Sequence, residues 1–339
     1  MLGLDSRTAR ATWTVAAIVG FVYAVYTIRS TIFVFAIALM FAYLLYPLLD
    51  AIDKYLSQTG ARESARIRAL GITYLIVLAL LIIFAIYIGT HVGAQAAQLA
   101  KRVTRPEISD EVRQWRVLNF PVGDQILQHY GEIAAMIPEL SIRVIEAGSN
   151  LIYVIVIPIM SFFLLKDGRR ALELLLEASG ENREVVSATV NDGHTLMLQY
   201  MRALFLLCLS VLVSFSVVLS LMGVPYAILL ASIAFPLEFV PMVGPLIAGC
   251  TIVAVSLFSG YAHVSWVVAF LLLYRFFQDY VLSPHLMSKG VELHPMLVIL
   301  GVFAGGEIGG VGGIFLSVPV IALLRLFYYR LRAPRDKTA

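Results

Sequence analysis

Residues 235–245 read Phe-Pro-Leu-Glu-Phe-Val-Pro-Met-Val-Gly-Pro and lie in the middle of a long apolar run. Three prolines, one glycine and one carboxylate fall within this stretch: Pro236, Pro241, Pro245, Gly244 and Glu238. Lipid cannot hydrogen-bond the backbone groups that a proline leaves unpaired, so such a break persists only where protein or a water-filled cavity surrounds it. A carboxylate at that depth usually marks an ion or substrate path. The stretch therefore predicts a helix that is broken inside a membrane, an arrangement typical of transporters.

The composition of the 339-residue chain indicates an integral membrane protein. Hydrophobic residues make up 60% of the chain and charged residues 14%, whereas soluble proteins have about 25% charged residues. The mean hydropathy is +0.87, so we expect an all-α integral membrane protein whose first partner is membrane lipid. The net charge of +3 forms no clustered basic face, and we expect no nucleic-acid partner.

Six apolar runs have about the 20 residues that a helix needs to cross the hydrocarbon core of a bilayer. They lie at about residues 12–28, 31–49, 68–91, 149–165, 203–223 and 263–283. Only Arg29 and Ser30 separate the first two runs, so we expect a tight helical hairpin there.

Two further apolar stretches, 226–258 and 295–326, do not fit a simple span. Glycine or proline interrupts each near its middle, the second at Gly305–Gly313 around Glu307. About 32 residues are few for two full crossings but suit two half-helices that meet inside the membrane. We therefore predict about eight membrane helical segments, either six full spans plus two opposed re-entrant hairpins or eight ordinary spans.

Lysine and arginine cluster at both ends of the chain and after the second and fourth runs. Because such residues gather on the cytoplasmic side, we predict a multi-pass membrane protein with both termini in the cytoplasm. Both topologies satisfy this orientation, but only the hairpin topology also places Lys289 in the cytoplasm.

These patterns divide the chain into five parts. They are N-terminal transmembrane helices at 1–91, a small extracytoplasmic helical subdomain at 92–146, the fourth span plus cytoplasmic amphipathic helices at 147–202, a transport core with two broken hairpins at 203–330, and a basic cytoplasmic tail at 331–339. Apolar residues at helical spacing, such as Ile126, Tyr130, Ile133 and Ile137, favour helix in the second part.

The candidate functional residues cluster at the two breaks and on the 263–283 run. Glu238 and Glu307 can each bind a cation or carry a proton, or can accept backbone N–H groups that the breaks leave free. Arg275 and Asp279 are four residues apart and can pair on one helix face, as part of the path or as a purely structural ion pair. The predicted substrate or ion path comprises Glu238, Pro241, Gly244, Pro245, Arg275, Gln278, Asp279, Glu307, Gly309 and Gly310.

Chemistry other than transport finds little support in the sequence. No nucleophile–base set or metal-ligand spacing is visible, so we expect neither an enzyme nor a metal site nor a cofactor. Cys208 and Cys250 lie in apolar runs and are interpreted as buried small side chains. The glycines of 305–313 lack the lysine of a phosphate-binding loop, which argues against transport driven by ATP.

Short motifs along residues 12–330 resemble, in order, those of the autoinducer-2 exporter family of bacterial membrane permeases. The matching segments are 41–48, 162–168, 200–202, 223–226, 240–245, 280–287, 294–295 and 309–319. The resemblance implies an inner-membrane transporter, with members linked to autoinducer-2 export or to sodium/proton antiport, and it implies a homo-oligomer. The chain departs from the usual pattern at Ala203, Glu238, Asp279 and Glu307, and its extra carboxylates favour cation handling over a neutral solute.

Three hypotheses follow from the sequence. The first is a secondary transporter of a small polar solute, with autoinducer-2 as a candidate, coupled to protons or sodium. The second is a sodium or other cation/proton antiporter that uses Glu238 and Glu307. The third is a membrane scaffold that binds partners through residues 92–146 and transports nothing.

Overall fold

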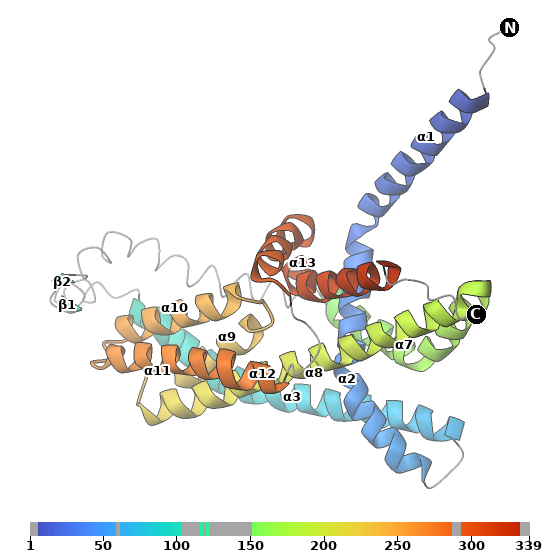
Figure 1. Ribbon diagram of the computed structural model, residues 1–339. Helices are drawn as coiled ribbons and strands as arrows, with labels where there is room; N and C mark the ends of the chain where they lie inside the picture. Colours follow the sequence, from blue (N-terminus) through green and yellow to red (C-terminus); the bar gives the residue numbers. More distant parts are fainter. Residues whose placement is uncertain are drawn as a thin grey trace.

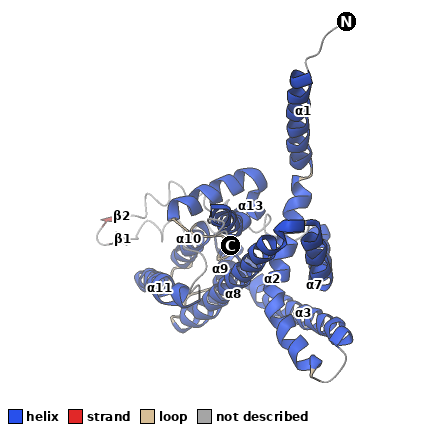
Figure 2. Cartoon of the chain, turned by 45° about the vertical axis from the view of Figure 1, so that its right-hand side comes forward, coloured by secondary structure: helices blue, strands red, loops and turns tan. Residues whose placement is uncertain are grey.

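The computed structural model describes residues 6–58, 62–103, 116–117, 120–121, 151–286 and 293–332. Within these residues the protein is an all-α membrane protein, as the composition predicts (Figure 1; Figure 2). Its long helices are α1 (Ser6–Thr27), α2 (Arg29–Ser57), α3 (Arg62–Val103), α7 (Leu151–Ala178), α8 (Arg183–Leu221), α9 (Ala227–Leu237), α10 (Val243–Phe258), α11 (Val264–Phe277) and α13 (Pro295–Arg332). Short elements are the 3-10 turn η1 (Gly180–Asn182), the π-helical turn η2 (Gln278–Leu282), α12 (Ser283–Leu286), and the two-residue strands β1 (Arg116–Val117) and β2 (Phe120–Pro121), which pair antiparallel.

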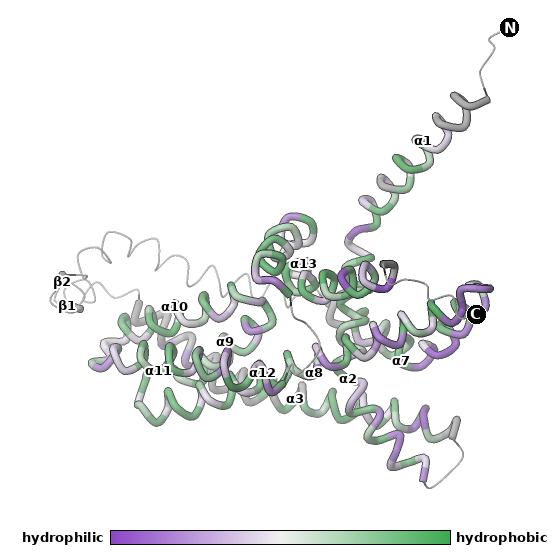
Figure 3. Tube along the Cα trace, in the orientation of Figure 1, coloured by the Kyte–Doolittle hydropathy of each residue, from purple (hydrophilic) through white to green (hydrophobic). Residues whose placement is uncertain are grey.

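Four helical segments of the described chain are long and apolar enough to cross a membrane. They are Arg29–Ser57, Gly180–Leu221, Val264–Leu286 and Pro295–Arg330. Hydrophobic residues make up much of the length of these helices (Figure 3), and many large hydrophobic side chains are exposed, among them Leu221, Leu273 and Phe303. A surface of this kind is stable in lipid and not in water, so the protein is a multi-pass membrane protein.

The tight hairpin predicted between the first two apolar runs does not form. Ile28 donates its backbone N–H to Ala24 and accepts that of Ile32, so helical hydrogen bonds continue across the junction. Only Ile28 departs mildly from helical geometry, with φ −93° and ψ 11°. Because neither Arg29 nor Ser30 breaks a helix, α1 continues from α2 at an angle and projects away from the other helices (Figure 1).

Helix α8 connects the two hairpins with the rest of the molecule, because it packs against α2, α9 and α13. Its buried residues recur every three or four positions, as one face of a helix requires. They include Thr189, Gly193, Met197, Met201, Leu204, Cys208, Val211, Phe215 and Leu219. The amphipathic stretch before residue 202 and the fifth predicted span therefore form a single continuous helix.

Each of the two interrupted stretches folds back on itself. Helices α9 and α10 pack together as the first hairpin, and their buried Leu230, Ala234, Ala248 and Ile252 join a core with α8 and α11. Helix α13 changes direction at Gly309 and Gly310, whose backbone angles are not helical, so its arms 295–308 and 311–332 form the second hairpin (Figure 1).

A separate bundle of α2, α3 and α7 lies beside this core. Its buried residues are Ala42, Leu45, Leu49, Ala69, Leu70 and Leu165. Helix α3 runs on to Val103 and so passes the predicted boundary at residue 92. The residues that predict helix in 92–146, Ile126 to Ile137, lie outside the described residues, as do residues 333–339 of the basic tail.

Candidate functional site

The break in the first hairpin is a short loop from Glu238 to Met242 that connects α9 with α10. Local backbone bonds hold its shape: the N–H of Glu238 donates to Ala234, that of Val240 to Leu237, and that of Gly244 to Val240. Pro245 lies in the first turn of α10, where the missing N–H costs no helical hydrogen bond. The sequence predicted this break, and the structure shows that it is a defined turn.

Met242 adopts a strained backbone conformation at the end of the loop. Its φ is 63° and its ψ is −49°, and the N–H of Val243 donates to the carbonyl of Pro241 over 2.7 Å. This is a γ-turn with positive φ, which is rare and strained for a residue with a side chain. Strain of this kind costs about 1–3 kcal/mol and concentrates at functional sites and switches.

Gly244 allows the two helices of the first hairpin to approach each other. A Cβ atom at this position would overlap the carbonyl oxygen of Leu237, a backbone atom that cannot move aside. Glycine is therefore required at residue 244 for the close contact between the two helix ends.

Glu238 is buried at the break and is hydrogen-bonded to a second buried polar side chain. It is 8% exposed, and Gln278 is 4% exposed. The amide Nε2–H of Gln278 donates to Oε1 of Glu238. A buried carboxylate requires such a partner, because an unpaired polar group inside a protein costs several kcal/mol. The structure therefore brings together two predicted site residues that are far apart in sequence.

Gln278 opens the π-helical turn η2, which joins α11 to α12. Single π-turns inside helices occur frequently at functional sites. In the same region Arg275 and Asp279 form the ion pair that their spacing predicts, with 2.9 Å between Nε and Oδ2. Both side chains of this pair are partly exposed, and Asp279 directly follows Gln278, the hydrogen-bond partner of Glu238.

The second hairpin is built on close backbone contact between its two arms. A Cβ on Gly305 would overlap the carbonyl of Gly313, and one on Gly309 would overlap the ring of Phe33 in α2. These glycines therefore allow tight packing of the arms on each other and on α2. Glu307 is exposed on the first arm, and none of the described contacts joins it to Glu238. Each of the two carboxylates thus lies at the break of its own hairpin, and the joint role of Glu238 and Glu307 stays a prediction.

The two hairpins meet through aromatic rings that flank the first break. The ring centroids of Phe235 and Phe239 are 6.0 Å apart, and those of Phe239 and Phe315 are 5.9 Å apart. Phe239 follows Glu238 directly in the chain, and Phe315 lies on the second arm of α13. A movement of either hairpin would therefore change the packing of Phe239 against Phe315.

The structure places further polar residues near the first hairpin that were not predicted from the sequence. The hydroxyl of Tyr274 lies 2.7 Å from that of Ser210 on α8, and Gln95 of α3 accepts the N–H of Leu229 at the start of α9 over 3.1 Å. Tyr274 precedes Gln278 by four residues, so helical spacing places both on one face. That spacing was the available signal for Tyr274, whereas nothing in the sequence indicated Ser210 or Gln95.

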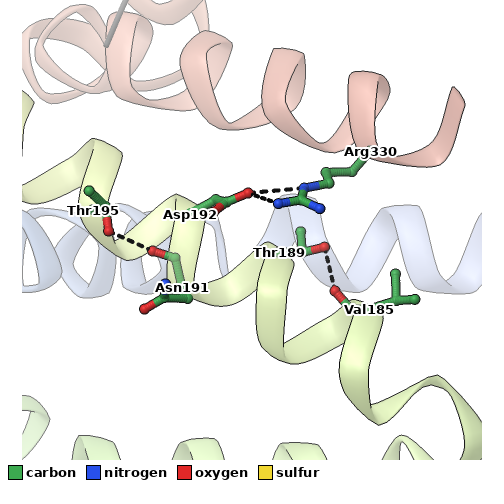
Figure 4. A network of polar contacts seen from close by, with 6 residues as sticks. All are labelled: Val185, Thr189, Asn191, Asp192, Thr195 and Arg330. Carbon is green, nitrogen blue, oxygen red and sulfur yellow. Dashed lines mark hydrogen bonds and ion pairs between the residues drawn. The ribbon is translucent and has the colours of Figure 1, made fainter. Parts of the chain in front are cut away.

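A polar contact also ties the second hairpin to α8. Arg330 of α13 donates from Nε to Oδ2 of Asp192 over 3.0 Å, and a second donation from Nη2 reaches the same oxygen (Figure 4). One residue further along α8, a Cβ atom on Gly193 would come into van der Waals contact with Leu323 and Leu326 of α13. The far end of the second hairpin is thus anchored while its glycine tip packs on α2.

By its fold, with several membrane-capable helices and a buried carboxylate at a break between two short helices, the protein belongs to the class of multi-pass helical membrane proteins. Residues 15–333 match the model of the family described as AI-2E family transporter, and the chain belongs to this family. The resemblance found in the sequence motifs is therefore confirmed.

Curated relatives carry names of the same class. "Putative transport protein MT0215" of Mycobacterium tuberculosis is 34% identical over 164 residues, which cover 47% of this chain and 44% of that protein. "Putative permease PerM" of Escherichia coli K12 is 26% identical over 176 residues, 51% of this chain and 50% of that protein. "Putative transport protein MJ1177" of Methanocaldococcus jannaschii is 24% identical over 328 residues, 92% of this chain and 93% of that protein. The match thus spans half or less of the first two relatives and nearly all of the third.

Proposed function

We propose that this protein is a secondary transporter that moves a small polar solute across the bacterial inner membrane, driven by protons or sodium ions. The single observation that carries the proposal is the buried Glu238–Gln278 hydrogen bond at the break of the first hairpin. A carboxylate and an amide together offer acceptors and donors to a hydroxylated solute, and the carboxylate can also bind a cation or a proton. Autoinducer-2 is the first solute to test, because the family is described by this name.

In the proposed mechanism, the first hairpin and the π-turn of α11 form the solute site, and the second hairpin moves against them. Transporters commonly bind substrate at discontinuous helices and expose the site alternately to each side. The contact between Phe239 and Phe315 supports this role, since it lies where the two hairpins touch. The path residues on this proposal are those of the first break together with Arg275, Gln278 and Asp279. Gly309 and Gly310 serve as the turn of the moving hairpin.

The placement in the cell and the assembly belong to the same proposal. The C-terminus lies in the cytoplasm, the two hairpins enter the membrane from opposite sides, and several copies of the chain assemble. The proposal keeps the predicted extracytoplasmic subdomain at 92–146, into which α3 extends as far as Val103, and the predicted transport core at 203–330.

A second candidate function is cation/proton antiport without an organic solute. It is favoured by the burial of Glu238 against Gln278, which lies between Arg275 and Asp279 in the chain. On this alternative the antiporter uses Glu238, which is buried, together with Glu307, which is exposed on the first arm of α13.

The test is a flux screen in proteoliposomes that contain the purified full-length protein. Protons, sodium and labelled autoinducer-2 are followed under imposed gradients, for the wild type and for Glu238→Gln. Solute transport that is weakened but retained by Glu238→Gln supports the first function, and complete loss of cation/proton exchange with no solute flux supports the second. Glu181→Gln, an exposed carboxylate on η1, is the matched control and is expected to behave as wild type. If no flux appears and deletion of 92–146 alone produces a phenotype, the protein is a scaffold and both proposals fail.

A further inference from the structure

The bundle of α2, α3 and α7 contains a basic side chain whose hydrogen-bonding capacity is not met. Arg66 of α3 is partly buried and donates from Nη2 to the backbone carbonyl of Leu165 on α7 over 2.9 Å. Its Nε–H is buried and has no hydrogen-bond partner among the described residues. No ion pair engages this guanidinium in the part of the chain that the structure describes. A buried donor without a partner is uncommon in native proteins, and the partly buried guanidinium keeps further N–H donors on its two terminal nitrogens.

Further positive charge lies next to Arg66. Lys166, Arg169 and Arg170 follow Leu165 on α7, at spacings of three and four residues that bring them onto one side of the helix. All three are exposed, and the structure shows no ion pair for them within its described residues. Asp167 is the one carboxylate in this part of α7. On this part of α7 the three cations therefore outnumber the single carboxylate and favour an anion, while Asp50 of the neighbouring α2 is paired with Lys54.

An apolar stripe leads away from these charges along the same helix. Ile155, Ile159 and Phe163 recur every four residues and are about half exposed, at 50%, 51% and 53%. The Lys166 ammonium lies over the Phe163 ring, 6.0 Å from its centroid, so the stripe ends at the charge cluster. From residue 155 to 166 the helix rises about 16 Å, and one leaflet of the hydrocarbon core is about 15 Å thick.

We propose that Arg66, Lys166 and Arg169 bind the phosphate headgroup of an anionic phospholipid, whose acyl chain lies along Ile155, Ile159 and Phe163. The guanidinium of Arg66 and the ammonium of Lys166 supply charge-assisted donors to the phosphate oxygens. The stripe distinguishes this ligand from a free phosphate ion, which has nothing to place there. Basic pockets between membrane helices are suited to such headgroups. This site is separate from the proposed solute path, because it belongs to the α2–α3–α7 bundle.

The experiment measures lipid binding to the delipidated full-length protein in detergent micelles by native mass spectrometry. Phosphatidylglycerol is the anionic probe and phosphatidylcholine the zwitterionic one, with inorganic phosphate added separately as a competitor. We expect the protein to bind phosphatidylglycerol more tightly than phosphatidylcholine, and each removed cation to weaken that binding by about fivefold. Millimolar phosphate should not compete.

Two variants and one control make the result specific. Arg66→Gln removes the half-buried donor, and the double variant Lys166→Gln/Arg169→Gln removes only exposed charges, so it tests the site even where Arg66→Gln fails to fold. Arg183→Gln removes an exposed cation at the start of α8 and should leave binding unchanged. Equal binding of the two lipids overturns the proposal, as does an equal loss in Arg183→Gln. Competition by inorganic phosphate alone also overturns it, because the ligand would then be a soluble anion.

Discussion

Gln278 on the π-turn after α11 donates a hydrogen bond to the buried carboxylate of Glu238, 40 positions earlier in the chain. The two side chains belong to different helical segments, and each lies where its segment departs from regular α-helix. This bond therefore ties the break of the first hairpin to the irregular turn of its neighbour. It is the contact on which the proposed solute site depends.

Replacing Gln278 by leucine should destabilise the protein. The substitution keeps the volume approximately constant but leaves the buried oxygen of Glu238 without its donor, at a cost of about 1–3 kcal/mol. We expect a lower midpoint of thermal unfolding in detergent micelles. The double variant Glu238→Leu/Gln278→Leu removes both partners, so it should recover part of the loss. Additive effects of the two single changes would show that the bond contributes nothing to stability.

Replacing Gly244 by alanine should disrupt the first hairpin. The added methyl would overlap the Leu237 carbonyl oxygen, and relief of that overlap requires movement of the backbone. Overpacking of this kind typically costs about 1–3 kcal/mol, so we expect a lower unfolding midpoint together with reduced solute flux.

Gly249 on the same helix provides the matched control for Gly244. Nothing lies within 4 Å of a Cβ built at Gly249, and alanine is favoured over glycine inside a helix by about 1 kcal/mol. Gly249→Ala should therefore unfold at the same temperature as wild type or slightly higher. A similar loss in both variants would attribute the effect to helix α10 in general and not to the turn.

Much of the fold could be predicted from the sequence, because apolar runs long enough to cross a bilayer indicate membrane helices. The break at 235–245 and the glycine turn near Gly309 followed from residues that cannot continue a helix in lipid. The pairing of Arg275 with Asp279 followed from helical spacing. The prediction of a hairpin at Arg29 and Ser30 was wrong. A short polar interruption forms a turn only if its residues break the helix, and neither arginine nor serine does so.

Tertiary contacts were beyond the reach of the sequence. Helical periodicity gives the face on which Gln278 lies but not the helix that this face meets, so its bond to Glu238 appears only in the fold. The same holds for Ser210. In the sequence nothing distinguishes it from other serines in apolar runs, and its hydrogen bond with Tyr274 appears only in the fold. Glu307 drew attention as a charge in an apolar stretch, yet the arm that carries it turns this residue outward.

Replacing Met242 by glycine should stabilise the protein. Glycine adopts positive φ without steric cost, so the strain of the γ-turn, about 1–3 kcal/mol, would be relieved. The extra freedom of glycine in the unfolded chain offsets about 0.5–1 kcal/mol of this gain. We expect a higher unfolding midpoint for Met242→Gly and a lower one for the control Val243→Gly, whose residue begins α10. An unfolding midpoint for Met242→Gly at or below that of wild type would mean that the turn stores no strain.

The two opposed hairpins predict that Lys54 and Lys289 face the same side of the membrane. From Lys54 the chain crosses the membrane three times before the first hairpin, which returns it to the side it left, and the following span then brings Lys289 back to the side of Lys54. If the stretches 226–258 and 295–326 were each a single span, these two lysines would face opposite sides. Single cysteines at the two positions, in a Cys208→Ala/Cys250→Ser background, can be labelled with a membrane-impermeant maleimide in intact cells and in inverted vesicles. We expect both to react in inverted vesicles only, and labelling of Lys289→Cys in intact cells would rule out the hairpin topology.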